Sequence, residues 1–270
     1  PISLRFQSTW PAKDIFHEYA LDYAKKVNDM SGGRLKIEVL PAGAVVKAFD
    51  LMDAVHKGTL DGGHGVVAYW YGKNSAVALW GSGPAFGMDP NMVLAWHYYG
   101  GGKDLLDEIY KGMNMDVVSM LYGPMPTQPF GWFKKPVTSA EQMKGLKFRV
   151  VRTPLFNDTF SALGANPTQM SWADAQPALA SGAVDGQENP LHIFTAAKLN
   201  TVGQKFVTTW GYLADPLIFV VNRDVWNSWT PEDREIVRQA AIDAGKQEIA
   251  LARKGLTAAD DAMYKEVAGM

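Results

Sequence analysis

Apolar and polar residues alternate at two places near the start of the chain, over residues 2–6 and again over residues 35–39. A period of two predicts half-buried β-strands, because successive side chains point to opposite faces. Between them, apolar side chains recur every four residues from Ile15 to Val27, which predicts a helix. We expect this helix to end at residues 31–33, where two glycines can take the left-handed cap conformation.

The alternation of strands and helices continues along the chain. The pattern predicts a helix over residues 48–56, a strand over 60–67, a strand over 146–150 and a helix from Ser171 to Gly182. Strands that alternate with helices are typical of an α/β fold with largely parallel pairing.

Two patterns in the last sixty residues of the sequence predict a buried strand and a long helix. Residues 217–221 form an unbroken apolar run, which predicts a strand covered on both faces that returns the chain to its first half. Thr230, Pro231 and Glu232 form a helix start, with a capping hydroxyl, a proline at the first position and an acid near the dipole. This helix is expected to continue past Ala250 and to brace both halves.

One segment of the first half recurs in the second. Gly58 and Asp61 have counterparts in Gly182 and Asp185, which follow them by the same 124 residues. In both copies a helix ends at a glycine and leads directly into a short strand, so we expect two related lobes with a cleft between them. Chance recurrence of this junction in α/β proteins is the alternative. The proline-rich residues 122–129 predict an extended crossover between the lobes.

Composition excludes several classes of protein. The chain has 270 residues, with 26 Lys and Arg against 28 Asp and Glu, so its net charge of -2 argues against nucleic-acid binding. It has no cysteine, which excludes disulfides, thiolate zinc sites and a cysteine nucleophile. No nucleophile elbow, zinc-protease motif or dinucleotide fingerprint is present. The five histidines lack metal-ligand spacing, and only His64, beside a strand end, is a candidate base.

A small set of side chains suits a binding cleft. Arg149 interrupts an apolar strand, and a guanidinium binds a carboxylate with two parallel hydrogen bonds. An ordinary Arg–acid ion pair is the alternative. Glu188 and Asn189 follow a strand, where ligands of open α/β folds bind. Several aromatic residues near strand ends are candidates for the pocket walls, although most large aromatics are core residues: Trp10, Tyr69, Trp70, Tyr71, Trp210 and Tyr212.

Three segments resemble motifs of one family. Residues 31–43, 144–150 and 181–190 are similar, in this order, to signatures of the substrate-binding proteins of TRAP (tripartite ATP-independent periplasmic) transporters. Residues 69–74, 81–88 and 122–128 resemble the branch that binds α-keto acids. The resemblance extends from about Ser3 to Val237.

The resemblance implies roles for individual residues. Arg149 would anchor the ligand carboxylate and Asn189 would make a polar contact, although that branch usually has a tryptophan at this position. Gln128 and Glu188 would hold a Ca²⁺ or Na⁺ ion that bridges to the substrate. Oxygen ligands suit such hard cations. Trp10, Trp70, Tyr71 and Trp210 would form the walls.

The resemblance also implies a two-lobed, type II-like periplasmic-binding-protein fold. Residues 1–123 and 215–250 would form lobe I, and residues 124–214 and 251–270 lobe II. Such a protein would capture a small 2-keto or 2-hydroxy monocarboxylate, aromatic acids included, in the periplasm and deliver it to the membrane permease. It would be no enzyme, its export signal would have been removed before Pro1, and a homodimer is an alternative to a monomer. The competing interpretation is a metal-dependent enzyme acting on such acids, with metal at Gln128 and Glu188.

Overall fold

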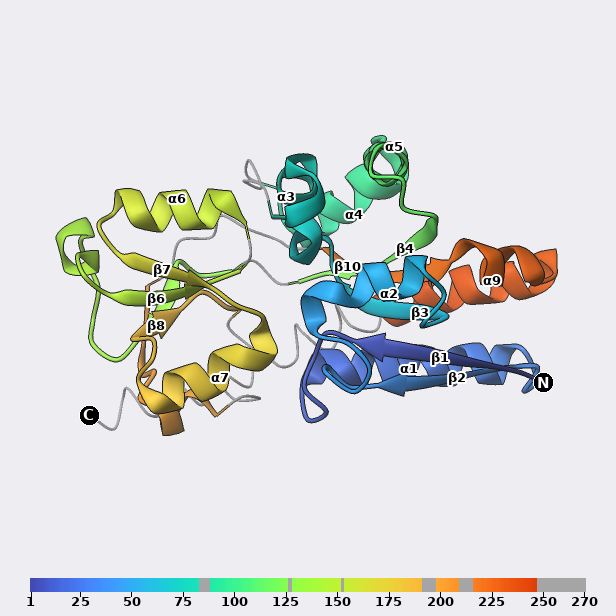
Figure 1. Cartoon of the computed structure of the whole chain (residues 1–270), viewed down its shortest axis with the longest axis horizontal. Helices are drawn as coiled ribbons and strands as arrows, with labels where there is room; N and C mark the ends of the chain where they lie inside the picture. Colours follow the sequence, from blue (N-terminus) through green and yellow to red (C-terminus); the bar gives the residue numbers. More distant parts are fainter. Residues whose placement is uncertain (83–87, 126–127, 152, 191–197, 209–215, 247–270) are drawn as a thin grey trace.

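The computed structural model describes residues 1–82, 88–125, 128–151, 153–190, 198–208 and 216–246. These residues form two α/β lobes side by side, each built on a five-stranded sheet (Figure 1). Lobe I contains the N-terminus, and lobe II is formed by the middle of the chain.

Lobe I is built on a sheet with the strand order β2-β1-β3-β10-β4. Its elements are β1 (Ile2–Ser8), α1 (Ile15–Met30), β2 (Leu35–Leu40), η1 (Ala48–Asp50), α2 (Leu51–His56), β3 (Gly62–Val66), η2 (Val67–Lys73), α3 (Ser75–Ser82), α4 (Pro90–Tyr99), α5 (Gly102–Gly112), β4 (Val117–Pro124), β10 (Pro216–Asn222) and α9 (Arg223–Ser228). Residues 231–246 form a further helix after α9.

Lobe II is built on a sheet with the strand order β7-β6-β8-β5-β9. Its elements are β5 (Gly131–Phe133), η3 (Ala140–Met143), β6 (Lys147–Val150), α6 (Pro154–Ala162), β7 (Asn166–Gln169), α7 (Trp172–Ser181), β8 (Gly186–Gln187), η4 (Leu199–Val202) and β9 (Phe206–Thr208).

The two sheets share one pattern. Three parallel strands, β2-β1-β3 in lobe I and β7-β6-β8 in lobe II, are followed by one antiparallel strand, β10 or β5. The last strand, β4 or β9, runs in the direction of the first three. The expectation of largely parallel pairing is therefore wrong, because β10 and β5 pair antiparallel with both of their neighbours. Each of these two strands enters its sheet directly after the chain has crossed from the other lobe.

The repeated junction has the same structural role in both lobes. Gly58 and Gly182, which follow α2 and α7, have φ angles of 72° and 74°. The Asp61 carboxylate accepts the Arg5 backbone N–H at 2.7 Å, and the Asp185 carboxylate accepts that of Lys147 at 3.0 Å. The recurring residues therefore fasten each helix–strand junction to the neighbouring strand.

Lobe I also carries the predicted apolar strand and the described part of the predicted long helix. The five residues 217–221 of β10 are fully buried between β3 and β4. Asp233, near the start of the final helix, accepts from Arg34 at 2.8 Å, and a Cβ at Gly245 would lie 1.7 Å from the Tyr122 carbonyl oxygen. These contacts place residues 231–246 on lobe I. The continuation past Ala250 lies outside the described residues.

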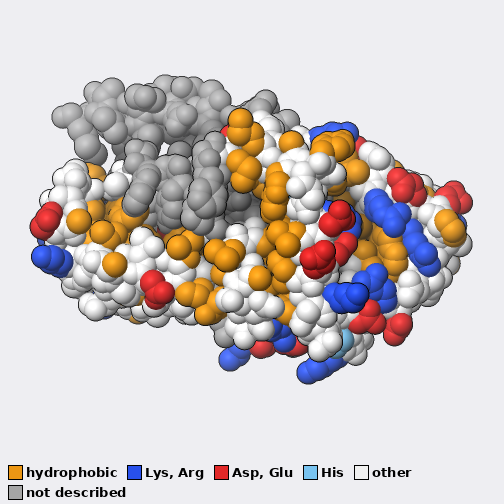
Figure 2. Space-filling view, turned by 90° about the horizontal axis from the view of Figure 1, so that it is seen from above, with side chains coloured by type: hydrophobic (Ala, Val, Ile, Leu, Met, Phe, Trp, Pro, Cys, Tyr) orange, Lys and Arg blue, Asp and Glu red, His pale blue; other side chains and the backbone are white. Residues whose placement is uncertain are grey.

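Apolar side chains gather on the face that carries α3, α4 and α5, near the middle of Figure 2. Leu79, Met92, Tyr99 and Leu105 are exposed large hydrophobic residues of these helices. Gly100 and Gly101 link α4 to α5, and Gly101 has a φ of 86°. Within the described residues, no helix has both the length and the apolar character needed to cross a bilayer.

Candidate functional site

Arg149 lies on β6, and only 2% of its surface is exposed. Its Nε and Nη2 donate to the Met170 carbonyl oxygen at 3.1 and 2.9 Å. Its Nη1 donates to the carbonyl oxygen and to Oε1 of Glu188, at 3.1 and 3.0 Å. Four of the five guanidinium N–H groups are thus engaged, and one on Nη2 has no acceptor among the described residues. A two-bond fork to a ligand carboxylate would require Arg149 to exchange one of these partners.

Glu188 follows β8 and forms a buried ion pair with Arg149. Its Oε1 also accepts the backbone N–H of Val151. Burial raises the pKa of Glu188, whereas the guanidinium and the Val151 N–H act in the opposite direction. Because its charge offsets that of Arg149, the pair leaves little net positive charge for an anion.

The pair faces a cavity between the lobes. Its volume is about 20 Å³, which is room for about one water molecule. The lining residues come from both lobes and from the crossover between them: Trp10, Phe16, Val66, Tyr69, Met125, Gln128, Arg149, Val151, Trp172, Glu188 and Asn189. A carboxylic acid therefore enters only when the lobes separate or these side chains move.

Gln128 and Asn189 supply the uncharged polar groups of the cavity. Gln128 Oε1 is buried and has no hydrogen-bond partner among the described residues. The Asn189 side chain donates to Gln187 Oε1 at 3.1 Å, and its carbonyl oxygen accepts from Trp132 Nε1 at 3.0 Å. Asn189 is therefore held in place, whereas the Gln128 oxygen accepts no hydrogen bond from the described residues.

The predicted aromatic walls are only partly brought together. Trp10 lines the cavity, whereas Trp70 and Tyr71 are not among its lining residues. Their neighbour Tyr69 lines it instead, because successive residues of the 3₁₀ helix η2 point in different directions. Trp70 is buried in lobe I, and Trp210 lies outside the described residues.

His64 fixes the position of the Trp10 side chain through a hydrogen bond. The Trp10 indole Nε1 donates to His64 Nδ1 at 2.9 Å, and His64 is completely buried. Burial lowers the pKa of His64 to about 3, so the imidazole is neutral at pH 7. His64 is absent from the cavity lining and its Nδ1 is occupied, so it is unsuited to act as a catalytic base on a bound acid.

The sequence analysis missed five residues that line the cavity, namely Phe16, Val66, Met125, Val151 and Trp172, and it missed Asp14, which bonds to one of them. Trp172, the first residue of α7, lines the cavity and is bonded to Asp14 of lobe I. Asp14 caps the start of α1, and Trp172 is the first residue of α7, directly after Ser171. Polar caps at helix starts were the available signal, but nothing local indicates that the two starts meet.

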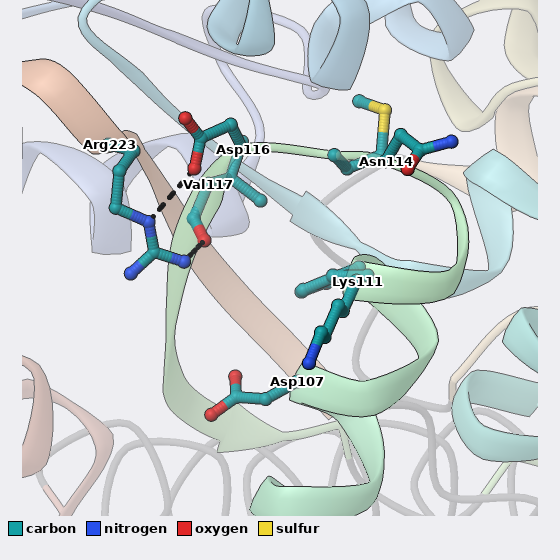
Figure 3. A pocket seen from close by; sticks show the side chains of 8 residues that line it. Asp107, Lys111, Asn114, Asp116, Val117 and Arg223 are labelled. Atoms are coloured by element: carbon teal, nitrogen blue, oxygen red, sulfur yellow. Dashed lines mark hydrogen bonds and ion pairs between the residues drawn. The ribbon is translucent and has the colours of Figure 1, made fainter.

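A larger depression lies on lobe I, away from this site, and Figure 3 shows it at close range. Its volume is about 490 Å³, and it lies among α5, β4 and α9. Arg223 there already donates to the Asp116 carboxylate at 3.1 Å and to the Val117 carbonyl oxygen at 2.7 Å. With Asp107 and Lys111 adding one charge of each sign, this depression has no cationic excess for an acid.

Comparison with known proteins places this geometry in a family. A family model described as bacterial extracellular solute-binding protein, family 7, matches residues 6–270. The chain belongs to this family. The family model and the relatives below describe binding proteins, not enzymes, so they do not support the alternative of a metal-dependent enzyme.

Individual members of the solute-binding family are similar over most of the chain. A monocarboxylate 2-oxoacid-binding periplasmic protein of Nostoc sp. is 33% identical over 89% of this chain. The chain spans 65% of the length of that relative.

Two solved structures of TRAP periplasmic solute-binding proteins have the same two-lobed fold. The protein from Ralstonia eutropha, with bound (S)-2-acetolactate, is 43% identical, has a TM-score of 0.86 and covers 99% of this chain and 84% of its own. The protein from Pseudoalteromonas atlantica, with bound sodium and pyruvate, is 28% identical, has a TM-score of 0.88 and covers 98% of this chain and 79% of its own.

Proposed function

We propose that this chain is the periplasmic solute-binding component of a TRAP transporter and that it captures a small 2-oxo or 2-hydroxy monocarboxylate in the interlobe cavity. Family membership supports the transport role. The relatives that bind monocarboxylate 2-oxoacids, acetolactate and pyruvate support the ligand class. The loaded protein would deliver its acid to the permease subunits in the membrane.

The observation that carries the proposal is the buried Arg149, which lines the cavity with one N–H unused. This N–H can donate to one carboxylate oxygen of a ligand. A charge-assisted hydrogen bond in a site closed to water is stronger than a neutral one. Within the described part of the chain, Arg149 is the only arginine or lysine that lines this cavity, which favours an acid with one carboxylate over a diacid.

A cation would complete the site. Since Glu188 offsets the charge of Arg149, a bound monocarboxylate brings a negative charge that the site alone does not balance. The unpaired Gln128 Oε1 and the Glu188 carboxylate offer the oxygen ligands that Na⁺ or Ca²⁺ prefers. The two oxygens of a 2-oxo or 2-hydroxy acid would supply further ligands, so we expect acid and cation to bind together.

Isothermal titration of pyruvate into the protein tests this function. Titrations are run in sodium buffer, in choline buffer with a calcium chelator, and in that choline buffer with calcium added in excess. We expect tight binding only where Na⁺ or Ca²⁺ is present. Gln128→Leu removes the amide oxygen at similar volume, and its residual binding should no longer depend on the cation.

Equal pyruvate affinity in all three buffers would contradict the bridging cation. If no 2-oxo or 2-hydroxy monocarboxylate binds under any condition, the proposed ligand class is wrong. The homodimer stays a prediction, and sedimentation velocity of the purified chain decides between monomer and dimer.

A further inference from the structure

Trp172 joins the two lobes through two hydrogen bonds. Its backbone N–H donates to the Tyr69 hydroxyl at 2.9 Å, and its indole Nε1 donates to the Asp14 carboxylate at 2.5 Å. Trp172 begins α7 of lobe II, while Asp14 and Tyr69 belong to lobe I. Both bonds thus join the two lobes, and at most 6% of each of the three residues is exposed.

The same segment of lobe II also holds the anchoring arginine. Arg149 donates twice to the Met170 carbonyl oxygen, two residues before Trp172. Displacement of the Arg149 guanidinium by a ligand would therefore move the backbone that positions Trp172. Residues 170–172 thus connect the Arg149 guanidinium in the cavity to the two hydrogen bonds that Trp172 forms between the lobes.

Asp14 serves two elements with its two oxygens. Oδ1 accepts the Phe16 backbone N–H at 2.8 Å and caps α1, while Oδ2 accepts from Trp172. The cap fixes the carboxylate before the lobes meet, so little side-chain freedom is lost when the contact with Trp172 forms. A buried hydrogen bond to a charged group is also stronger than one between neutral groups.

We propose that Asp14, Tyr69 and Trp172 form an interlobe latch that holds the closed state and slows release of the bound acid. The proposal rests on the proposed function for its ligand, but the latch itself is a property of the two lobes. The latch residues act on closure and do not bind the carboxylate. Opening the cavity requires breaking both bonds of Trp172.

The lobe distance can be measured directly because the chain has no cysteine of its own. Glu18→Cys on α1 and Ala180→Cys on α7 place spin labels at exposed positions on the two lobes. Asp14→Asn keeps one oxygen for the Phe16 cap and replaces the other with an NH₂ that repels the indole N–H. Trp172→Phe removes the indole donor, and Tyr69→Phe removes the hydroxyl acceptor.

Two variants within lobe I are matched controls. Asp89→Asn changes an aspartate that caps α4 through the Met92 N–H, and Trp80→Phe removes an indole bond to the Gly102 carbonyl oxygen. We expect the three latch variants to shift the spin-label distances to longer values in protein without added acid. The controls should leave the distribution unchanged. Unchanged distances in all three latch variants would overturn the proposal.

Ligand kinetics provide the second readout. With pyruvate and sodium in stopped-flow fluorescence, the dissociation rate should rise about ten-fold in Asp14→Asn and in Tyr69→Phe, the typical effect of losing one hydrogen bond to a charged or buried group. The association rate should change less than two-fold. A structural defect alone would instead lower the fraction of active protein and leave the dissociation rate as it was.

Failure of the latch and failure of the proposed function give different results. If pyruvate does not bind but the variants still lengthen the label distance, the ligand class is wrong and the latch stands. If pyruvate binds with the parent dissociation rate in every latch variant, the latch is wrong and the function stands.

Discussion

At the scale of single residues, the Arg149–Glu188 pair both shapes lobe II and defines the cavity. The two residues are each 2% exposed and form an ion pair at 3.0 Å. Breaking a buried ion pair by removing one partner is strongly destabilising, because the remaining charge is left without compensation. Loss of ligand binding in a single Arg149 variant would therefore combine a structural effect with a binding effect.

Replacing both members of the pair separates these effects. We expect Arg149→Met and Glu188→Met each to lower the free energy of unfolding by about 3 kcal/mol or more. The double variant should recover most of this loss, because no unpaired charge remains buried, yet it should not bind pyruvate. Urea unfolding and isothermal titration measure the two quantities. Pyruvate binding by the double variant would show that the pair does not recognise the acid.

His64 makes the stability of lobe I depend on pH. Its pKa is about 3 in the folded protein against 6.5 for an unperturbed histidine, so the unfolded chain binds more protons between these values. The stabilisation is complete above pH 6.5 and is lost as the pH falls toward 3. Burial of His97, whose pKa is lowered to about 4, acts in the same direction.

We therefore expect the free energy of unfolding to fall between pH 6 and pH 4, by up to about 1.4 kcal/mol per pH unit for each such histidine. His64→Asn keeps an acceptor near the Nδ1 position but does not titrate, so its stability should change less over this range. Chemical denaturation at a series of pH values checks this slope. A variant with the slope of the parent would show that His64 is not responsible.

At the scale of elements, the repeated helix–strand junction explains why the two lobes have the same topology. Gly182 follows α7 with a φ of 74°, and the space around its missing Cβ is empty. Only the backbone conformation therefore requires glycine there. Gly112 at the end of α5 also has empty space, but its φ lies outside the left-handed region.

These two glycines predict opposite effects of the same substitution. Gly182→Ala should lower the free energy of unfolding by about 1–2 kcal/mol, because a side chain strains the left-handed conformation. Gly112→Ala should raise it by about 0.5–1 kcal/mol, because alanine loses less conformational freedom in a helix. Urea unfolding measures both. Equal effects of the two substitutions would contradict a conformational requirement at Gly182.

At the scale of the whole molecule, each sheet contains a strand that the chain forms directly after it has crossed from the other lobe. β10 comes after every described element of lobe II in the chain, yet it lies between β3 and β4 of the first sheet. Without β10, both neighbours lose a partner strand and the buried run 217–221 is missing from the core. The sheet of lobe I is therefore complete only after the chain has passed from lobe I to lobe II and back again.

Fragments of the chain test this dependence. Residues 1–124 alone should remain largely unfolded, because the first sheet lacks one of its inner strands. Co-expression with residues 216–246 should restore a folded lobe. Circular dichroism and the dispersion of amide signals in NMR spectra report folding. A well-dispersed spectrum from residues 1–124 alone would show that β10 is dispensable.

The sequence predicted the elements more completely than the site. Strands β1, β2, β3 and β10 and helices α1 and α2 of lobe I appear where the apolar patterns place them, since such patterns lie within a few neighbouring residues. The short strand expected directly after Gly182 is formed by Gly186–Gln187. Helices α3, α4, α5, α6 and α9 were not predicted. The apolar residues of α3 and α4 lack a clear one-sided spacing.

Sequence by itself determined that two related α/β lobes exist, that β10 returns to the first, and which family the motifs indicate. Tertiary structure alone decided that Tyr69 faces the cavity, that Glu188 pairs with Arg149, and that Trp172 bonds to Asp14, 158 residues away. Strand and helix patterns are local properties of the chain. Which side chains meet in the cleft depends on how the two lobes pack together. A pattern within a few neighbouring residues cannot predict a contact between residues so far apart in the sequence.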